Sequence, residues 1–395
     1  RFLLMVEVPE QHKSAWARGY GVVLRRWREA ATEQERDTAL LWLGFLPQAL
    51  LRKSVGRGGR KGRDQVAYRF TCLIEGDWGS LVDLWERDRE KECREGRGEG
   101  GGGEESMEKR RREVQGLIRT GQVGKAMNRV TSHGLASADD PAVRDQLQRK
   151  FPDRVDILPA SVRKVKPIEA FNGLRESLLK QEVKRGTSAG SGGMRPEYLV
   201  ALGERMDERE VGDLEAFGLS YTAGELPPWL YRLWLSTQTV PLYKSAEKDG
   251  IRPIGIRHTL PRLFHTEVIS QSKAEIREFL EPQQLGQSQA GGAKLVHCIS
   301  GMLEANPNFV CVSTDIENCY NTQNRAAALN GLQGAESLSH LTTFAATILA
   351  PVPALETRGK VWGSTGTGKI QGDSASGPLQ AIGFQLSVEI LDAEC

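Results

Sequence analysis

A length of 395 residues predicts two or three domains. The apolar content of 39% is enough for a core, and 26% charged residues suit a soluble protein. Its 53 basic and 51 acidic residues leave a net charge of only +2, which hides local blocks of either sign. No run of 18 apolar residues occurs, so we expect no membrane span. The N-terminal stretch has an early charge and no cleavage-like site, which argues against a signal peptide.

The six cysteines are scattered, without a Cys-x-x-Cys pair or a metal-binding spacing to the six histidines. They indicate reduced thiols in an intracellular protein. Because the chain begins at Arg1 and stops at Cys395 inside an apolar helical pattern, we expect it to be a fragment of a longer protein.

An N-terminal helical region is expected over residues 1–93. Trp16 and Tyr20 belong to a helical stripe, and Thr32 with Glu35 forms a capping-box pattern before the next apolar run.

A basic, glycine-rich loop is expected within this region, at Arg52–Arg63. A loop of this composition can follow a phosphate backbone, whereas a solvated surface loop is an equally good interpretation. The candidate nucleic-acid-binding cations are Arg57, Arg60, Lys61 and Arg63.

Residues 94–112 have the composition of a linker, with four consecutive glycines between mixed charges. Residues 113–166 are expected to be a helical segment that starts with a small helical hairpin ending at His133 and Gly134. His133 is more consistent with a partner of the helix dipole than with a metal ligand.

From Pro167 onward, glycine clusters and strand patterns appear. The loop Gly186–Pro196 leads into a helix at Glu197, and its flexible backbone, with Arg195, can approach a nucleic acid closely; a plain loop is the alternative. One long helix is expected over Leu260–Phe279.

Two apolar segments with a polar turn between them predict paired β-strands, Thr239–Lys244 and Ile251–Ile256, joined by Ser245–Gly250. The pair would hold Lys244 and Arg252 near each other, which suits the binding of a triphosphate. The alternative is a pair of exposed cations at the edge of a sheet.

In the segment Asn308–Asn321, a short apolar run is followed by an acidic and then an aromatic residue. Its apolar run Phe309–Val312 predicts a buried strand that ends near Asp315, and Tyr320 follows five positions later. A carboxylate at the mouth of a buried strand is costly unless a cation meets it, most often a divalent metal. The alternative is that Asp315 caps the helix expected over Asn324–Leu332.

Residues Gly363–Lys369 fit the P-loop pattern, but the next residue, Ile370, has no hydroxyl group to bind magnesium. No helix is expected at Lys369 because Gly372 and Gly377 follow. We therefore reject a P-loop and place the next helix later, with Pro378 in its first turn. Its apolar residues recur on one face: Leu379, Ile382, Leu386 and Ile390.

Five pieces of the chain, in this order, resemble the reverse transcriptases of non-LTR (LINE-type) retrotransposons. They are Gly-Gly-Met-Arg-Pro-Glu-Tyr-Leu (Gly192–Leu199), Arg252-Pro253-Ile254, Gln-Ser-Gln-Ala-Gly-Gly (Gln287–Gly292), Asp315 with Tyr320-Asn321, and Gln371-Gly372-Asp373. The resemblance covers Pro167 to the end. The segment around Arg110–Asp153 also looks like the part that precedes the fingers in these elements.

The resemblance implies a role for each matching residue. Asp315 would be the catalytic residue and, with the backbone carbonyl of Ile316, would bind magnesium. Tyr320 would pack beneath the sugar and favour deoxynucleotides by excluding a ribose 2′-hydroxyl. Lys244 and Arg252 would neutralise the triphosphate.

The loop Gln371, Gly372 and Asp373 would lie beside the nascent base pair and the template. The implied reaction is RNA-directed DNA synthesis, in which a 3′-hydroxyl attacks an α-phosphate and two Mg²⁺ ions hold the attacking and leaving oxygens. The implied partners are an RNA template, a DNA primer and dNTPs. The nucleus is the expected location.

Two features depart from the family pattern. The family's loop places a proline directly after Gly-Asp and another four positions after the Asp, whereas the loop here, Ser374–Pro378, is one residue longer. The family's second metal-binding motif, an aromatic-x-Asp-Asp hairpin, does not occur downstream, and the adjacent pair Asp139-Asp140 lies far upstream in an expected loop. Because one carboxylate cannot hold two magnesium ions, we expect this chain alone not to polymerise nucleotides.

The expected fold is α+β. An N-terminal helical region would precede an incomplete right-hand polymerase over residues 167–395, with fingers and part of a palm and without a thumb. The missing thumb would leave apolar surface near Leu379–Leu391 uncovered, which predicts poor solubility. The alternative is a degenerate retroelement remnant, or a nucleic-acid-binding module, that keeps the fold without catalysis.

Overall fold

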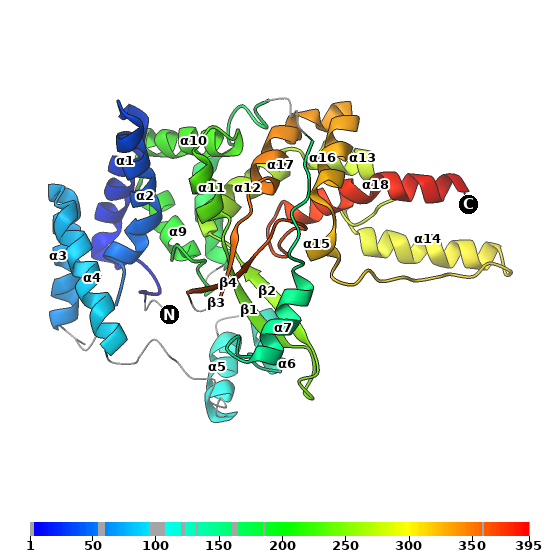
Figure 1. Cartoon of the computed structure of the whole chain (residues 1–395), viewed down its shortest axis with the longest axis horizontal. Coiled ribbons are helices and arrows are strands. Elements are labelled where there is room, and N and C mark those ends of the chain that lie inside the picture. The colour runs from blue at the N-terminus through cyan, green and yellow to red at the C-terminus, as the bar shows by residue number, and fades with distance from the viewer. Residues whose placement is uncertain are drawn as a thin grey trace.

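The computed structural model describes residues 4–53, 60–94, 107–119, 123–131, 133–159, 165–184, 186–357 and 359–394. Within these ranges helices dominate, and one four-stranded sheet lies in the middle of an elongated molecule (Figure 1). The fold is therefore mixed α+β, as the sequence predicts. No helix in the described ranges is long and apolar enough to cross a membrane.

Helices make up the N-terminal end of the molecule, as predicted. They are η1 (Glu10–His12), α1 (Lys13–Glu29), α2 (Glu33–Leu50), α3 (Arg60–Glu75) and α4 (Trp78–Arg94). The predicted capping box at the start of α2 is confirmed: Glu35 N donates to Thr32 Oγ1 at 3.2 Å, and Thr32 N donates to Glu35 Oε2 at 3.1 Å.

Helix α1 packs into the same core as helices that follow much later in the chain. The buried indole Nε1 of Trp16 donates a hydrogen bond to the carbonyl oxygen of Tyr198 at 3.0 Å. The Tyr198 hydroxyl donates in turn to the carbonyl oxygen of Met5 at 2.6 Å. The N-terminal helices therefore form one packed unit with the helices around Tyr198.

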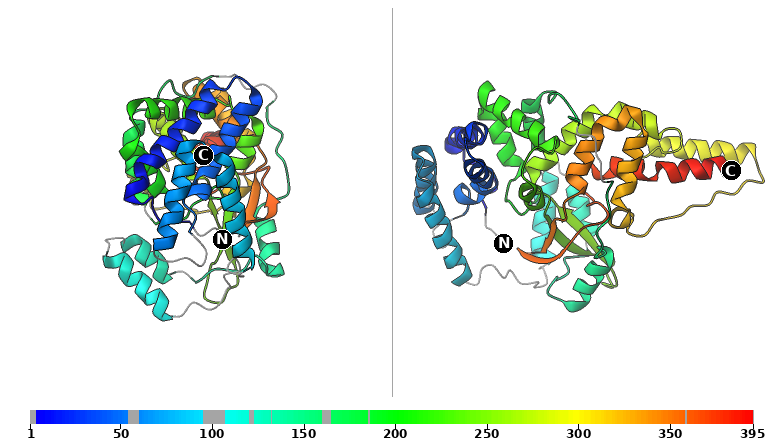
Figure 2. Two further views of the ribbon diagram at one scale, coloured as in Figure 1. Left: turned by 90° about the vertical axis from the view of Figure 1, so that its left-hand side faces the viewer. Right: turned by 45° about the horizontal axis from the view of Figure 1, so that its top comes forward.

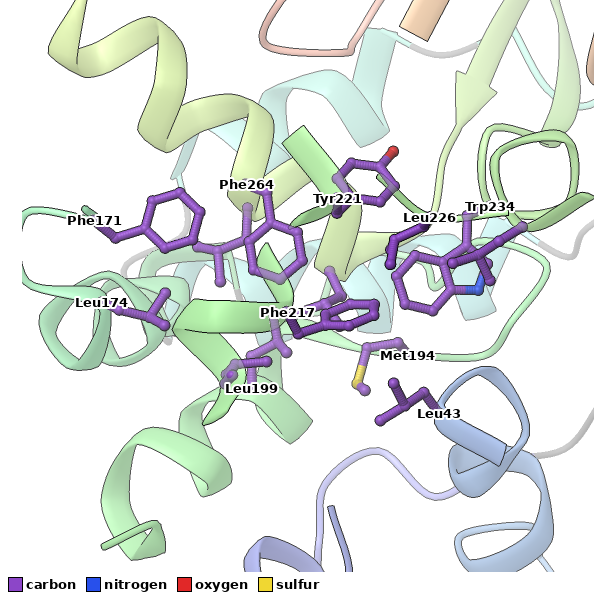
Figure 3. Close-up of a cluster of buried hydrophobic side chains, with 14 of the residues drawn as sticks. Leu43, Phe171, Leu174, Met194, Leu199, Phe217, Tyr221, Leu226, Trp234 and Phe264 are labelled. Carbon is purple, nitrogen blue, oxygen red and sulfur yellow. The ribbon is translucent and has the colours of Figure 1, made fainter. Parts of the chain in front are cut away.

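A second group of helices surrounds this core. They are α8 (Leu174–Leu179), η2 (Lys180–Lys184), α9 (Pro196–Arg205), α10 (Glu208–Thr222), α11 (Pro228–Trp234), α12 (Thr259–Gln271) and α13 (Lys273–Leu280). Figure 3 shows where they meet α2, with Leu43 near Met194 and Phe217. The prediction of one long helix over residues 260–279 is wrong. The backbone leaves helical geometry at Ser272 (φ −93°, ψ 11°), whose hydroxyl bonds to His340 Nε2 at 3.1 Å.

The sheet has the order β2-β1-β3-β4. Its strands are β1 (Thr237–Tyr243), β2 (Ile251–Ile256), β3 (Ala354–Thr357) and β4 (Lys360–Ser364). The predicted hairpin is confirmed, because β1 and β2 pair antiparallel. Strand β3 joins β1 in parallel through two residue pairs only.

In chain order, α4 is followed by α5 (Met107–Arg119), α6 (Val123–Thr131) and α7 (Pro141–Lys150). Helices α5 and α6 form the predicted hairpin, and Arg129 Nη2 pairs with Glu113 Oε2 at 2.9 Å. The expected linker at residues 94–112 includes the last residue of α4 and the start of α5, and residues 95–106 lie outside the described ranges.

The C-terminal part contains α14 (Gly291–Ala305), α15 (Cys319–Thr322), α16 (Arg325–Gly334), η3 (Glu336–Leu341), α17 (Thr342–Leu349) and α18 (Ser376–Glu394). Helix α14 and the far half of α18 extend away from the body of the molecule (Figure 2). Helix α14 has no buried residue, and Leu386, Ile390 and Leu391 on α18 are exposed. The uncovered apolar surface expected near Leu379–Leu391 is thus present in the second half of that range.

Candidate functional site

The segment that leads to Asp315 is not the buried strand that the sequence predicts. Residues 309–316 are irregular and exposed, with Val310 84% and Val312 79% exposed. A β-branched run becomes a buried strand only where neighbours pair with its backbone and cover its side chains. No described strand pairs with this run. Asp315 is therefore exposed, and the desolvation cost argued from the sequence does not arise.

Asp315 does not cap a helix either. The N-cap of α16 is Asn324, whose Oδ1 accepts a hydrogen bond from Ala326 N at 2.8 Å. The Ile316 carbonyl oxygen, expected to bind magnesium, accepts from Cys319 N at 3.3 Å. In the described part of the chain, no three His, Cys, Asp or Glu side chains are placed to hold a metal.

Tyr320 lies against the glycine-rich segment before α18. Lys369 N donates to the Tyr320 carbonyl oxygen at 2.6 Å. Gly368 has φ +65°, and a Cβ there would lie 2.2 Å from the carbonyl carbon and oxygen of Asn321. Only glycine permits this approach. The ring of Tyr320 is half-buried, and a Cβ on Gly377 would lie 3.8 Å from its hydroxyl oxygen.

The Gln371–Gly372 turn rests on strand β2. A Cβ on Gly255 would lie 2.3 Å from Ile370 Cγ2 and 3.6 Å from the Gln371 carbonyl oxygen. Gly372 has φ +103°, and a Cβ there would lie 3.4 Å from the Gly255 carbonyl oxygen. Gln371 and Gly372 are exposed. The turn is therefore seated on the same strand that carries Arg252.

Asp373 points inward, unlike the two residues before it. Its carboxylate pairs with Arg257 Nη1 at 2.8 Å and His265 Nδ1 at 3.0 Å, and accepts from Ala375 N at 3.0 Å. Burial by itself raises the pKa of Asp373, but the attraction of His265 and Arg257 outweighs it and holds the pKa well below its usual range. The side chain is an internal anchor of the loop, so the exposed members of the predicted loop are Gln371 and Gly372.

Lys369 is buried, which agrees with the rejection of a P-loop. Its ammonium group bonds to the side-chain oxygens of Gln323 and Gln380. Burial, with the nearby charge of Arg325, lowers the pKa of Lys369 to about 7. Arg325 is also internal, donating to the carbonyl oxygens of Gly368 at 2.8 Å and Thr365 at 2.9 Å. These contacts fix the backbone beside Tyr320.

Lys244 and Arg252 share one face of the β1–β2 hairpin. Leu242 pairs with Arg252 in the register. Lys244 directly follows β1, and its N donates to the Gly250 carbonyl oxygen at 2.8 Å, which continues the antiparallel pairing by one step and places Lys244 on the same face as Leu242. Lys244 is therefore a diagonal neighbour of Arg252, as predicted, and both side chains are exposed.

Sequence reasoning missed two cations that contact the segment Asp315–Thr322. Lys150 Nζ donates to Asn318 Oδ1 at 3.2 Å. Arg154 Nη2 donates to the carbonyl oxygen of Thr322 at 3.0 Å. Each contact joins residues 168 positions apart, so no local pattern could indicate it.

The other predicted nucleic-acid contacts stay predictions. Arg57 lies outside the described residues. Arg60, Lys61 and Arg63 lie in the first turn of α3, so the prediction of a loop that extends to Arg63 is wrong for its last four residues. Arg195 directly precedes α9 and is half-buried, and its Nε has no hydrogen-bond partner.

No protein-family model matches the chain, and no curated protein matches it.

Proposed function

We propose that the chain is the fingers and part of the palm of an RNA-directed DNA polymerase of the non-LTR retrotransposon type. The observation that carries the proposal is the convergence of three motifs that are distant in sequence. The Tyr320 carbonyl oxygen accepts a hydrogen bond from Lys369 N in the glycine-rich segment before α18, and the Gln371–Gly372 turn that follows rests on β2. The hairpin of β1 and β2 presents Lys244 and Arg252. A site for an incoming nucleotide needs cations for the triphosphate, a surface for the sugar and a surface for the base, all close to one another.

Each part has a distinct task in the proposal. The exposed cations Lys244 and Arg252 bind the triphosphate through charge-assisted hydrogen bonds. The half-buried ring of Tyr320, held in place by the backbone bond to Lys369, packs beneath the deoxyribose. The exposed turn Gln371–Gly372 faces the nascent base pair and the template. Holding the nucleotide in one orientation is the contribution of these residues to the reaction.

The described carboxylates do not complete a site for two Mg²⁺ ions. We infer that a further segment, bearing an adjacent pair of aspartates, pairs with the backbone of residues 309–315 and covers the apolar surface of α14. The exposure of that run and of Val296 and Met302 on α14 supports this inference, because apolar surface of this extent is normally covered. The predicted buried strand would then form upon pairing.

Primer extension on an RNA template tests the proposal. The protein would be the chain extended by a downstream segment that carries an Asp-Asp pair, compared with the same protein bearing Asp315→Ala. Magnesium-dependent cDNA is expected from the first and none from the second. Robust nucleotide incorporation by the 395-residue chain alone would refute the expectation that it is incomplete.

The second candidate is a nucleic-acid-binding remnant without catalysis. The observation that favours it is the lack, among described residues, of three side chains able to hold a metal. If the extended protein is folded and binds RNA but neither version yields cDNA, this candidate replaces the polymerase.

A further inference from the structure

We propose that Lys150, the last residue of α7, is a third phosphate-binding cation of the candidate site and that it acts with Lys244 and Arg252 on a nucleoside triphosphate. The inference rests on the proposed function. It adds to the site a residue from a helix that the sequence places ahead of the fingers.

Packing fixes the end of α7 beside the hairpin. Val143 and Leu147 of α7 form one cluster with Ile251, and Tyr243 packs against that cluster. Tyr243 and Ile251 are the paired residues next to the turn of the hairpin. Since Lys150 follows Leu147 by one helical turn, its side chain starts close to the end of the hairpin that carries Lys244.

A hydrogen bond directs Lys150 toward the predicted catalytic segment. Its Nζ lies 3.2 Å from Asn318 Oδ1, and Asn318 sits between Asp315 and Tyr320. Lys150 therefore lies between the hairpin cations and the segment where the sugar and the α-phosphate of a bound nucleotide are expected. A triphosphate that extends from Tyr320 toward Lys244 passes this position.

The charges around Lys150 favour an anion. Burial lowers the pKa of Lys150, the nearby Lys244 lowers it further, and Glu317 opposes this only in part. No described residue forms an ion pair with Lys150, Lys244 or Arg252. By contrast, the preceding residue, Arg149, pairs with Asp145 on its own helix. Lys150 and Lys244 repel each other, Glu317 offsets this repulsion only in part, and a bound polyanion would relieve the rest.

The number of cations favours a triphosphate over a single backbone phosphate. A nucleic-acid backbone carries one negative charge per phosphate, whereas a triphosphate concentrates several charges within the reach of three neighbouring cations. Binding of a template phosphate by Lys150 is thus the competing outcome that an experiment must separate.

The test is calorimetric titration of the full chain with dTTP in the presence of Mg²⁺. Lys150→Gln is expected to weaken dTTP binding about tenfold, because it removes one charge-assisted hydrogen bond at a half-exposed position. Lys150→Arg keeps the charge and should remain within about threefold of the unsubstituted chain. The matched control is Arg149→Gln, which removes a neighbouring cation that is already paired, and should leave dTTP binding unchanged. Inorganic tripolyphosphate should compete with dTTP.

Several outcomes would overturn the inference. Binding of dTTP that depends on Lys244 but not on Lys150 would exclude the third cation and leave the proposed function intact. If Lys150→Gln weakens binding of an RNA–DNA duplex and not of dTTP, Lys150 is a template contact. If Lys150→Arg loses as much affinity as Lys150→Gln and Asn318→Ala does the same, Lys150 acts only by holding Asn318. Absence of dTTP binding by the folded, unsubstituted chain would exclude the anion site, and primer extension would then decide the proposed function separately.

Discussion

Replacing Asp373 by asparagine should destabilise the protein strongly. Asp373 and Arg257 are 1% and 8% exposed at their side chains, and the carboxylate also pairs with His265. Asparagine has nearly the same shape but no charge, so the Arg257 guanidinium would stay buried without a counter-ion. Breaking a buried pair in this way costs about 3–5 kcal/mol. The free energy of unfolding, measured by urea titration followed by circular dichroism, should fall by that amount.

The matched control is the surface pair of Asp145 and Arg149, whose side chains are 55% and 74% exposed. Asp145→Asn should lower the free energy of unfolding by about 0.5 kcal/mol or less, because exposed pairs within a helix contribute little.

The pKa of Asp373 is depressed in the folded protein. The stabilisation that its carboxylate provides is therefore present above the unfolded pKa of about 3.9 and is lost as the pH falls below that value. The difference in free energy of unfolding between Asp373→Asn and the unsubstituted chain should therefore become smaller below about pH 4. Equal losses for Asp373→Asn and Asp145→Asn at pH 7 would refute the reasoning.

Three further predictions concern neighbouring features. Gly368→Ala should lower the free energy of unfolding by more than about 3 kcal/mol, because the new Cβ would overlap the backbone of Asn321. Gly372→Ala should lower it by only about 1–2 kcal/mol, because the new Cβ would meet only the Gly255 carbonyl oxygen, at 3.4 Å. Similar losses for the two variants in urea titrations would contradict this prediction. Burial lowers the pKa of Lys369 to about 7, whereas a lysine in the unfolded chain has a pKa of about 10.4. Between these two pH values the folded protein binds one proton fewer than the unfolded chain. The free energy of unfolding should therefore rise with pH between about pH 7 and pH 10.4. Lys369→Met should flatten this rise in urea titrations at pH 7 and 9, and an unchanged slope would show that Lys369 stays charged. The double variant Val310→Lys and Val312→Lys should raise solubility in sedimentation assays. It should change the free energy of unfolding by no more than about 0.5 kcal/mol, because both side chains are exposed. A large loss of stability would show that residues 309–312 are buried in solution.

Local patterns in the sequence predict the parts of the site that depend on short-range structure. The capping box at Thr32 and the pairing of β1 with β2 involve residues close in sequence, so propensity and turn chemistry suffice. The position of Arg252 relative to Lys244 then follows from the register.

The remaining parts depend on partners that are far away in the chain. The run at Phe309–Val312 has the composition of a strand, but composition cannot supply the neighbour that would pair with it. The bond from Lys150 to Asn318 spans 168 positions, and that from His265 to Asp373 spans 108. An aspartate in a Gln-Gly-Asp motif looks the same in sequence whether its carboxylate faces a ligand or a buried arginine.

The packing of α1 against Tyr198 has a consequence for the synthesis of the protein. Trp16 and its hydrogen-bond partner are 182 residues apart, and Met5 and Tyr198 are 193 apart. Translation proceeds at about 5–20 residues per second, so the partner of Trp16 emerges about 10–40 s after it. During that interval the face of α1 that packs against Tyr198 has no native surface to cover it. The helix α1 can therefore complete its native packing only after Tyr198 has been translated.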